Sequence, residues 1–238
     1  MCTECGCSST GHSHNLEHES RTIRVEEDLL AKNNRLAVGN RQLFAAKQLL
    51  VLNLVSSPGS GKTSILERTL TDLQGKLKFS VLEGDQQTTN DADRIAATGV
   101  PVKQINTGAG CHLDAHMVGH GVESFDLVET DILMIENVGN LVCPASFDLG
   151  EDHKVAVLSI TEGEDKPLKY PLMFQAADLM LINKIDLLPH INFDLEQCKA
   201  FARQINPQIE IMELSCHSGA GMQQWYDWLV QGANRKRH

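Results

Sequence analysis

The sequence is poor in basic residues and has no long apolar run. It contains 21 Lys and Arg against 31 Asp and Glu, for a formal net charge of −10 over 238 residues. A nucleic-acid surface needs clustered Lys and Arg, so this balance argues against a nucleic-acid partner. The longest stretch without a charged residue, 48–61, has 14 residues, whereas a membrane-spanning helix needs about 18 or more apolar residues. We therefore expect no membrane span.

The chain also lacks the features of a secreted protein. No charged segment followed by an apolar core opens it, so we expect no secretory signal. Seven cysteines, an odd number, are then typical of reduced thiols in the cytoplasm. These thiols are better explained as metal ligands than as disulfides, and we expect a cytoplasmic protein.

The first residues cannot form a core. Residues 1–20 include one large aliphatic side chain, Leu16, which is too little apolar surface to offset the entropy of ordering. From residue 23 to about residue 47, apolar residues recur at helical spacing, with Gly39 as the point where that helix can break. The predicted organisation is a flexible metal-binding tail over 1–22, a single domain over 23–232 and a basic solubilising tail over 233–238.

Beyond this helix, short apolar runs alternate with helical stretches. Most of the apolar runs are uninterrupted, as in parallel strands that are buried on both faces. Strand, helix and strand repeated in this way predict an α/β fold with a mostly parallel sheet and helices on both faces. The predicted strands are 49–55, 79–82, 102–105, 132–135, 155–160, 179–182 and 209–214, and the predicted helices are 64–73, 91–98, 112–123, 166–177, 194–205 and 222–230.

The segment after the first predicted strand indicates a phosphate site. Ser56-Ser57-Pro58-Gly59-Ser60-Gly61-Lys62-Thr63 matches the phosphate-loop pattern G-x-x-x-x-G-K-[ST], except that Ser56 replaces the first glycine. Lys62 is predicted to reach the β and γ phosphates, and the Thr63 hydroxyl to bind Mg²⁺. A turn that merely closes the strand is the alternative, which the strand before and the helix after disfavour. The predicted nucleotide contacts in this loop are Gly59, Ser60, Gly61, Lys62, Thr63 and Ser64.

A second motif indicates that the base is guanine. Asn183-Lys184-Ile185-Asp186 follows the apolar strand 179–182. The Asp186 carboxylate can accept both N1–H and N2–H₂ of guanine, whereas adenine would leave a buried carboxylate unpaired. The motif therefore predicts GTP as the substrate and GDP as the product. Ser215 and Cys216, after the last strand, occupy the place of a second base loop whose amide approaches guanine O6.

Two acidic residues at strand ends complete the predicted catalytic set. Glu136 opens Glu136-Asn137-Val138-Gly139, where many GTPases have Asp-x-x-Gly. Its carboxylate can bind Mg²⁺ or its waters, and the Gly139 amide can sense the γ-phosphate. Asp85 ends another strand at the sheet edge where ligands bind, and we predict that it holds Mg²⁺-bound water and orients the attacking water. A solvated loop carboxylate is the less favoured alternative for each acid taken alone.

The first seven residues contain three soft metal ligands. Cys2, Cys5 and Cys7 lie close to the terminal amine, and together these four groups suit square-planar Ni(II). Tetrahedral Zn²⁺ is the alternative. His12, His14 and His18 form either a weaker second store or an ordinary histidine-containing tail.

Cys111, His112 and Cys143 are predicted to form an internal site for nickel or zinc. Lone thiols are usually small buried hydrophobes. Cys143, however, lies four residues beyond Gly139, so a ligand there would respond to the nucleotide state. Three ligands leave the site open, or allow it to close across a dimer. The two remaining thiols, Cys198 and Cys216, are predicted to be structural.

Taken together, these residues resemble the hydrogenase-maturation nickel GTPases of the HypB family. The resemblance extends from about Arg24 to Leu229, and Ser56 is that family's own form of the phosphate loop. The segments that make up the resemblance are 54–63, 84–88, 110–114, 136–144 and 163–171.

The resemblance implies a P-loop NTPase of the deviant GTPase class related to the nitrogenase iron protein. It also implies a GTP-dependent homodimer, a partner nickel metallochaperone and delivery of nickel to the large subunit of [NiFe]-hydrogenase. In this reading the tail cysteines form a tight nickel site and the internal cluster a metal site in the GTPase domain. Two alternatives are the related urease-accessory GTPase, which lacks a Cys-x-x-Cys-x-Cys start, and a metal-storage or metal-sensing protein with a vestigial nucleotide fold.

Overall fold

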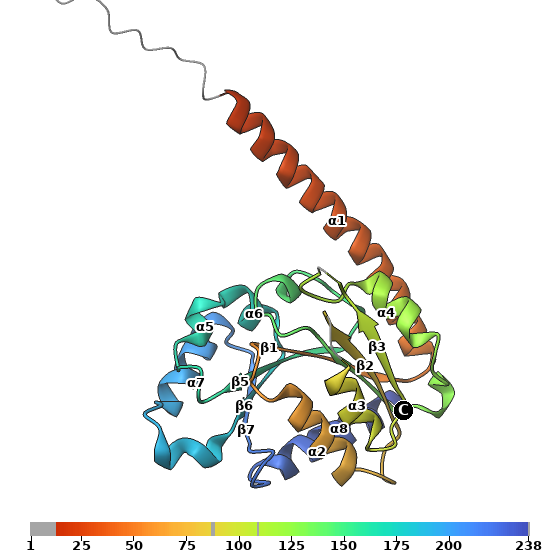
Figure 1. Cartoon of the computed structure of the whole chain (residues 1–238), viewed down its shortest axis with the longest axis vertical. Coiled ribbons are helices and arrows are strands. Elements are labelled where there is room, and N and C mark those ends of the chain that lie inside the picture. Colours follow the sequence, from red (N-terminus) through yellow and green to blue (C-terminus); the bar gives the residue numbers. More distant parts are fainter. Residues whose placement is uncertain (1–12, 87–88, 109, 238) are drawn as a thin grey trace, which may run out of the picture.

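The computed structural model describes residues 13–86, 89–108 and 110–237, and only the backbone of residues 13–26. It contains a seven-stranded sheet with the order β3-β2-β4-β1-β5-β6-β7, in which every neighbouring pair is parallel (Figure 1). Each predicted strand is confirmed. The strands are β1 (Leu50–Ser56), β2 (Phe79–Asp85), β3 (Val102–Asn106), β4 (Ile132–Glu136), β5 (His153–Ser159), β6 (Leu179–Asn183) and β7 (Glu210–Glu213).

Helices connect the strands and cover both faces of the sheet. The α-helices are α1 (Ser13–Ala46), α2 (Lys62–Asp72), α3 (Asn90–Ala96), α4 (Ala115–Val122), α5 (Lys166–Lys169), α6 (Pro171–Ala176), α7 (Leu195–Ile205) and α8 (Met222–Arg237). Short 3-10 helices are η1 (Leu127–Glu129), η2 (Cys143–Ala145) and η3 (Ile185–His190).

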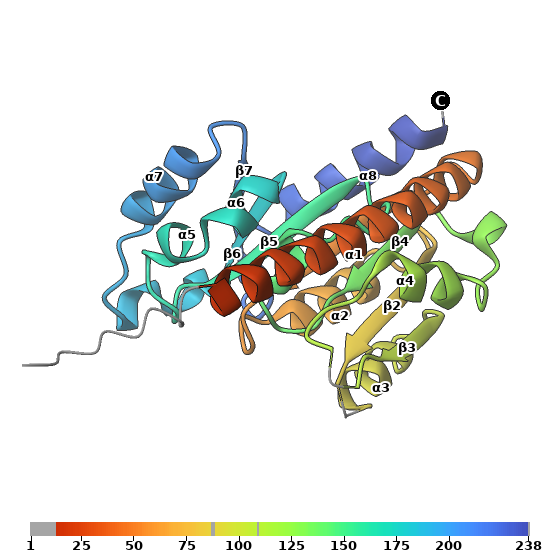
Figure 2. The ribbon, with the colours of Figure 1, turned by 90° about the horizontal axis from the view of Figure 1, so that it is seen from above.

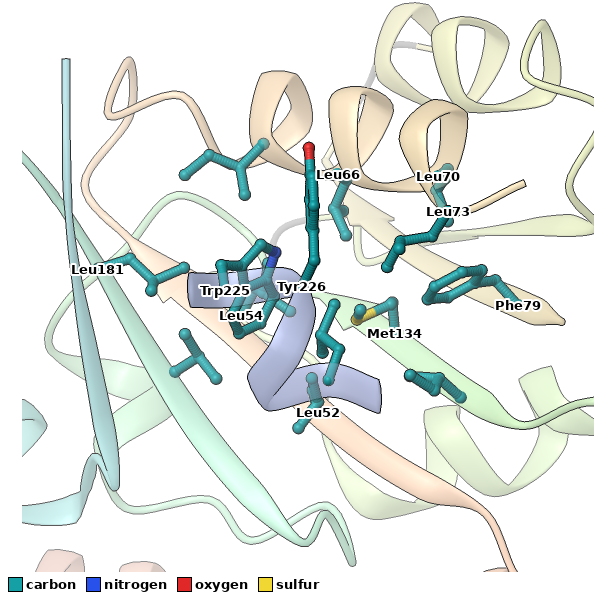
Figure 3. Packing of buried hydrophobic residues seen from close by; sticks show 14 of the residues in the cluster. Leu52, Leu54, Leu66, Leu70, Leu73, Phe79, Met134, Leu181, Trp225 and Tyr226 are labelled. Carbon is teal, nitrogen blue, oxygen red and sulfur yellow. The ribbon is translucent and has the colours of Figure 1, made fainter. Parts of the chain in front are cut away.

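Alternate strand residues pack into separate cores on the two faces. On one face Leu52 and Leu54 pack with residues of α2 and α8, among them the fully buried Trp225 (Figure 3). On the other face β1, β2 and β4 pack against α1 and α4, and β5 and β6 pack against α6 and α7. Figure 2 shows α1 running alongside α4 over this second face. Because strands buried on both faces are largely apolar, the central strands could be predicted from apolar runs in the sequence.

The first helix differs from its prediction. It begins at Ser13 rather than at residue 23, within the segment predicted to be a flexible tail, and it continues through Gly39 without a break. A glycine inside a helix costs only about 1 kcal/mol relative to alanine, so one glycine does not interrupt a helix of this length. Figure 1 shows the first half of α1 extending away from the rest of the domain.

Two other helix predictions need correction. The stretch 166–177 is two helices, because Pro171 begins α6 and the residue before a proline is biased away from helical backbone. The helix predicted from residue 112 begins at Ala115, where the Asp114 carboxylate accepts a hydrogen bond from the Met117 amide as an N-cap. The displaced start leaves Cys111 and His112 in a loop.

The basic C-terminus is helical rather than a frayed tail. The last helix extends to Arg237, beyond its predicted end at residue 230. Lys236 pairs with Asp152 and Arg237 pairs with Asp131, and these ion pairs attach the helix end to the sheet. No helix in the described part of the chain combines the length and apolarity that crossing a membrane requires.

Candidate functional site

The phosphate loop lies between the buried strand β1 and the first turn of α2. Gly59 and Gly61 have φ of 78° and 97°, a left-handed conformation that favours glycine. A Cβ at Gly61 would lie 2.5 Å from Nδ2 of Asn183, so glycine is also required sterically. Lys62 Nζ donates to Ser56 Oγ at 2.8 Å. The serine that departs from the strict pattern therefore supplies an acceptor for the lysine that is predicted to reach the phosphates.

The predicted base-reading residues converge on this loop. Asn183 Nδ2 donates to the Ser60 carbonyl at 2.9 Å, and Lys184 Nζ donates to the Gly59 carbonyl at 2.7 Å. The amide of Cys216, next to Ser215, approaches Asn183 Oδ1 at 3.5 Å, so both base loops meet at Asn183. At the end of this region, Asp186 Oδ1 is buried and has no hydrogen-bond partner among the described residues. An unpaired buried carboxylate oxygen suits a ligand that donates hydrogen bonds.

The predicted metal-binding hydroxyl and carboxylate are in contact. Thr63 Oγ1 donates to Glu136 Oε1 at 2.7 Å, while Glu136 Oε2 is buried without a partner among the described residues. Asp85 lines the same cleft from the end of β2. A threonine hydroxyl and carboxylates are oxygen donors of the kind that Mg²⁺ prefers, so these residues fit a Mg²⁺ ion.

A second buried carboxyl group, Glu83, lies beside Glu136 and was not predicted to be functional. The two residues are register partners on adjacent strands, and Glu83 is 2 % exposed. Burial, with a smaller contribution from Glu136, raises the pKa of Glu83 to about 8. Burial also raises the pKa of Glu136, against the opposing effect of Lys62, and lowers the pKa of Lys62. Only the sheet register brings these groups together, so the sequence motifs did not reveal the pair.

The raised pKa of Glu83 predicts that stability falls as pH rises. Between about pH 4.5 and pH 8 the folded protein retains a proton on Glu83 that the unfolded chain releases, so unfolding becomes easier as pH increases. We expect a loss of more than about 1 kcal/mol between pH 5 and pH 8 in metal-free protein, because one unit of pKa shift corresponds to about 1.4 kcal/mol. Urea unfolding across this range would measure it, and Glu83→Gln should flatten the dependence. An equal slope in Glu83→Gln would contradict the assignment.

The phosphate loop from Pro58 onward, together with Asp85, Glu136 and Lys184, lines one cleft of about 540 Å³, here called the nucleotide cleft. Its lining also includes Asp91 and Arg94 of α3, which were not predicted. Arg94 donates to Ser64 Oγ at 3.1 Å and to Glu67 at 2.6 Å. The complete lining is Pro58, Gly59, Ser60, Gly61, Lys62, Thr63, Ser64, Asp85, Gln86, Asp91, Arg94, Glu136, Val138, Gly139 and Lys184.

The loop after β4 lies against the phosphate loop. Val138 and Gly139 line the nucleotide cleft, and a Cβ at Gly139 would lie 3.1–3.2 Å from three atoms of Pro58. This close approach places Gly139 directly beside the phosphate loop. Cys143, four residues later, begins η2.

Cys143 meets Cys111 and His112, as the sequence predicted. Cys143 Sγ lies 2.7 Å from Cys111 Sγ, which is 3.5 Å from His112 Nδ1. The three ligand atoms lie within 4.8 Å of one another, the one such group of metal-binding side chains found among the described residues. Burial lowers the pKa of His112, which favours the neutral, metal-binding imidazole. We call Cys111, His112 and Cys143 the thiol–imidazole cluster.

The other predicted metal ligands cannot be placed. Cys2, Cys5, Cys7 and His12 lie outside the described residues, as do the side chains of His14 and His18. Of the thiols predicted to be structural, Cys198 is fully buried, whereas Cys216 is partly exposed beside the base loop.

Comparison with known proteins agrees with this geometry. The family model for the CobW/HypB/UreG nucleotide-binding domain matches residues 50–213. Hydrogenase maturation factor HypB of Azotobacter vinelandii is 64% identical over 211 residues, which is 89% of this chain and 70% of the relative. The chain belongs to the HypB family of hydrogenase maturation factors.

Two further HypB proteins extend the comparison. HypB of Escherichia coli K12 is 60% identical over 232 residues, 95% of this chain and 80% of the relative. The crystal structure of HypB from Helicobacter pylori in complex with nickel superposes with a TM-score of 0.82 at 40% identity, covering 86% of this chain and 96% of that one. The α/β P-loop NTPase fold is thereby confirmed for this HypB-family chain.

Proposed function

We propose that this HypB-family chain is a GTP-hydrolysing nickel metallochaperone that delivers nickel during maturation of [NiFe]-hydrogenase. The observation that supports this most directly is the position of the thiol–imidazole cluster. Its Cys143 follows, after three residues, a loop that lines the nucleotide cleft. A metal bound there would lie beside the part of the molecule that changes when a γ-phosphate is lost.

In this proposal the nucleotide cleft performs phosphoryl transfer mainly by positioning and electrostatics. The amides of Gly59, Ser60, Gly61 and Ser64 hold the phosphates, and Lys62 neutralises charge on the β and γ groups. Thr63 and Glu136 would hold Mg²⁺ with Asp85, and the ion would supply further neutralisation of phosphate charge. Asp85 is also our candidate for orienting the attacking water.

The partners follow from the family. We infer a homodimer that depends on GTP, a partner nickel metallochaperone that exchanges metal with this chain, and the [NiFe]-hydrogenase large subunit as the recipient. Nickel is the cargo of the cluster, and zinc is a competing occupant because it accepts the same thiolate and imidazole ligands. Reduced thiols at such a site suit the cytoplasm.

Base specificity provides the test of the proposed activity. The wild-type protein should hydrolyse GTP and not ATP, because Asp186 pairs with the N1–H and N2–H₂ of guanine. We expect Asp186→Asn to weaken GTP binding by about ten- to hundredfold, the effect of losing one buried charged hydrogen bond of about 1.5–3 kcal/mol. Xanthosine triphosphate has a carbonyl at C2 to which the new amide can donate, so it should bind the variant better than GTP. Competition binding of the three nucleotides would measure this.

Asp194→Asn is a matched control. Asp194 caps α7 through the Gln197 amide and belongs to neither predicted base loop, and asparagine caps helices equally well. A variant at Asp186 that still prefers GTP would refute the base assignment. A wild-type protein that binds nickel but hydrolyses no nucleotide would instead favour metal storage or sensing on a vestigial nucleotide fold.

A further inference from the structure

A buried amide joins the nucleotide cleft to one side of the thiol–imidazole cluster. Asn137 follows Glu136 at the end of β4 and is 2 % exposed. Its Oδ1 accepts from the Val138 amide at 3.0 Å and from the Leu113 amide, also at 3.0 Å. Val138 lines the nucleotide cleft, and Leu113 directly follows His112. One side-chain oxygen therefore bridges the nucleotide loop and the segment that contains Cys111 and His112.

The same amide begins a chain of buried polar groups. Asn137 Nδ2 donates to Asn53 Oδ1 at 3.2 Å, and Asn53 Nδ2 donates to Glu151 Oε1 at 3.0 Å. Glu151 Oε1 lies 3.8 Å from Lys154 Nζ. Asn53 is fully buried, and Glu151 and Lys154 are nearly so. Buried polar groups that satisfy one another in this way hold a single arrangement.

Lys154 ends this chain on the other side of the cluster. Its ammonium donates to the carbonyls of Pro144, Ala145 and Phe147, at 2.9, 3.3 and 3.1 Å. An ammonium group has three donors, so all of them are directed at the segment that begins with Cys143. Phe147 in turn packs against the His112 ring, with 4.0 Å between centroids.

We propose that Asn137 is a positioning residue that transmits movement of the nucleotide loop to the Cys111–His112 side of the cluster, while Lys154 holds the Cys143 segment in place. This inference rests on the proposed function. When the Val138–Gly139 backbone moves, the oxygen that bonds the Val138 amide must move or lose that bond. The Leu113 amide, which shares the oxygen, then shifts with it, whereas the carbonyls held by Lys154 stay fixed.

The two residues should therefore have different effects on metal binding. The test uses the full chain with Cys2, Cys5 and Cys7 replaced by serine, titrated with Ni²⁺ in saturating GDP and in a saturating non-hydrolysable GTP analogue. Asn137→Ala should bring the ratio of the two nickel affinities close to one. Lys154→Met should weaken nickel binding at least severalfold in both states and leave the ratio unchanged. Asn206→Ala, which removes an amide bonded to three carbonyls beside α6, should change neither quantity.

A conservative variant distinguishes a positioning role of Asn137 from an effect of misfolding. Asn137→Asp keeps an oxygen acceptor for both amides, and burial favours the protonated carboxyl, whose hydroxyl can still donate to Asn53. Asn137→Asp should therefore retain most of the wild-type ratio of nickel affinities. A purely structural role of Asn137 does not predict this result. The d–d spectrum of bound Co²⁺ should differ between the two nucleotide states in the wild type and not in Asn137→Ala.

The outcomes separate this inference from the proposed function. A wild-type ratio that persists in folded Asn137→Ala overturns the inference and leaves the metallochaperone proposal standing. Equal nickel affinities in both states of the wild-type protein also overturn it. A protein that neither hydrolyses GTP nor binds nickel at the cluster refutes the proposed function itself.

Discussion

Replacing Lys62 by alanine should lower GTP turnover by about 10²–10³-fold, the usual effect of removing one donor aimed at developing transition-state charge. Lys62 lines the nucleotide cleft, and its Nζ donates a hydrogen bond to Ser56 Oγ. The lysine is nearly buried beside Glu136, and its pKa is lowered by burial and partly restored by that carboxylate. The proposed function needs this charge beside the γ-phosphate, so removing it should slow turnover. Steady-state hydrolysis with Mg²⁺ at saturating GTP would measure the loss.

The fold should survive the substitution, because alanine is a good helix former and the α2 backbone at this position is regular. Lys78→Ala is the matched control. Lys78 is an exposed lysine paired with Glu129 on the surface, where an ion pair contributes little to stability. Its turnover should equal that of the wild type. Lys62 is not the phosphate-binding lysine if the Lys62→Ala variant has the melting temperature of the wild type and still hydrolyses GTP at more than a tenth of the wild-type rate.

The central strands were predictable because they are buried on both faces. β1, β4, β5 and β6 are largely apolar runs in the sequence, whereas the edge strands β3 and β7 are shorter and contain more polar residues. Helix ends were less predictable, because long-range contacts decide them. Arg237 and Lys236 extend α8 by pairing with acidic residues that are distant in sequence, which helical periodicity does not encode.

Some residues of the candidate site were likewise predictable from the sequence and others were not. Lys62, Thr63, Asp186 and Gly139 belong to short motifs whose spacing alone indicates phosphate and base contacts, and the structure brings the motifs to one cleft. Glu83, Arg94 and the polar chain from Asn137 to Lys154 have no such spacing. Strand register places Glu83 beside Glu136, and the position of α3 brings Arg94 to the cleft. These contacts, like those of the polar chain, depend on the fold and cannot be read from residue spacing.

Nucleotide state should change the metal affinity of the thiol–imidazole cluster by about five- to 150-fold, which corresponds to a coupling free energy of about 1–3 kcal/mol. Gly139 lies against Pro58, and Cys143 begins η2 four residues later. A γ-phosphate that bonds the Gly139 amide would fix the Val138–Gly139 loop, and hydrolysis would release it, so that the Cys111–His112 side of the cluster shifts relative to Cys143. The coupling is reciprocal, so nickel or zinc in the cluster should alter nucleotide affinity by the same factor. The N-terminal thiols should show little such dependence.

Metal titrations of the chain with Cys2, Cys5 and Cys7 replaced by serine, in saturating GDP and in a non-hydrolysable GTP analogue, would measure the effect. Gly139→Ala should reduce it, because the added Cβ would meet the Pro58 backbone at 3.2 Å and displace the loop. Gly39→Ala is the control, since a Cβ there meets nothing within 4 Å. If the cluster binds metal equally well in both states, hydrolysis cannot time the release of nickel from it. The GTPase and the metal sites would then act independently.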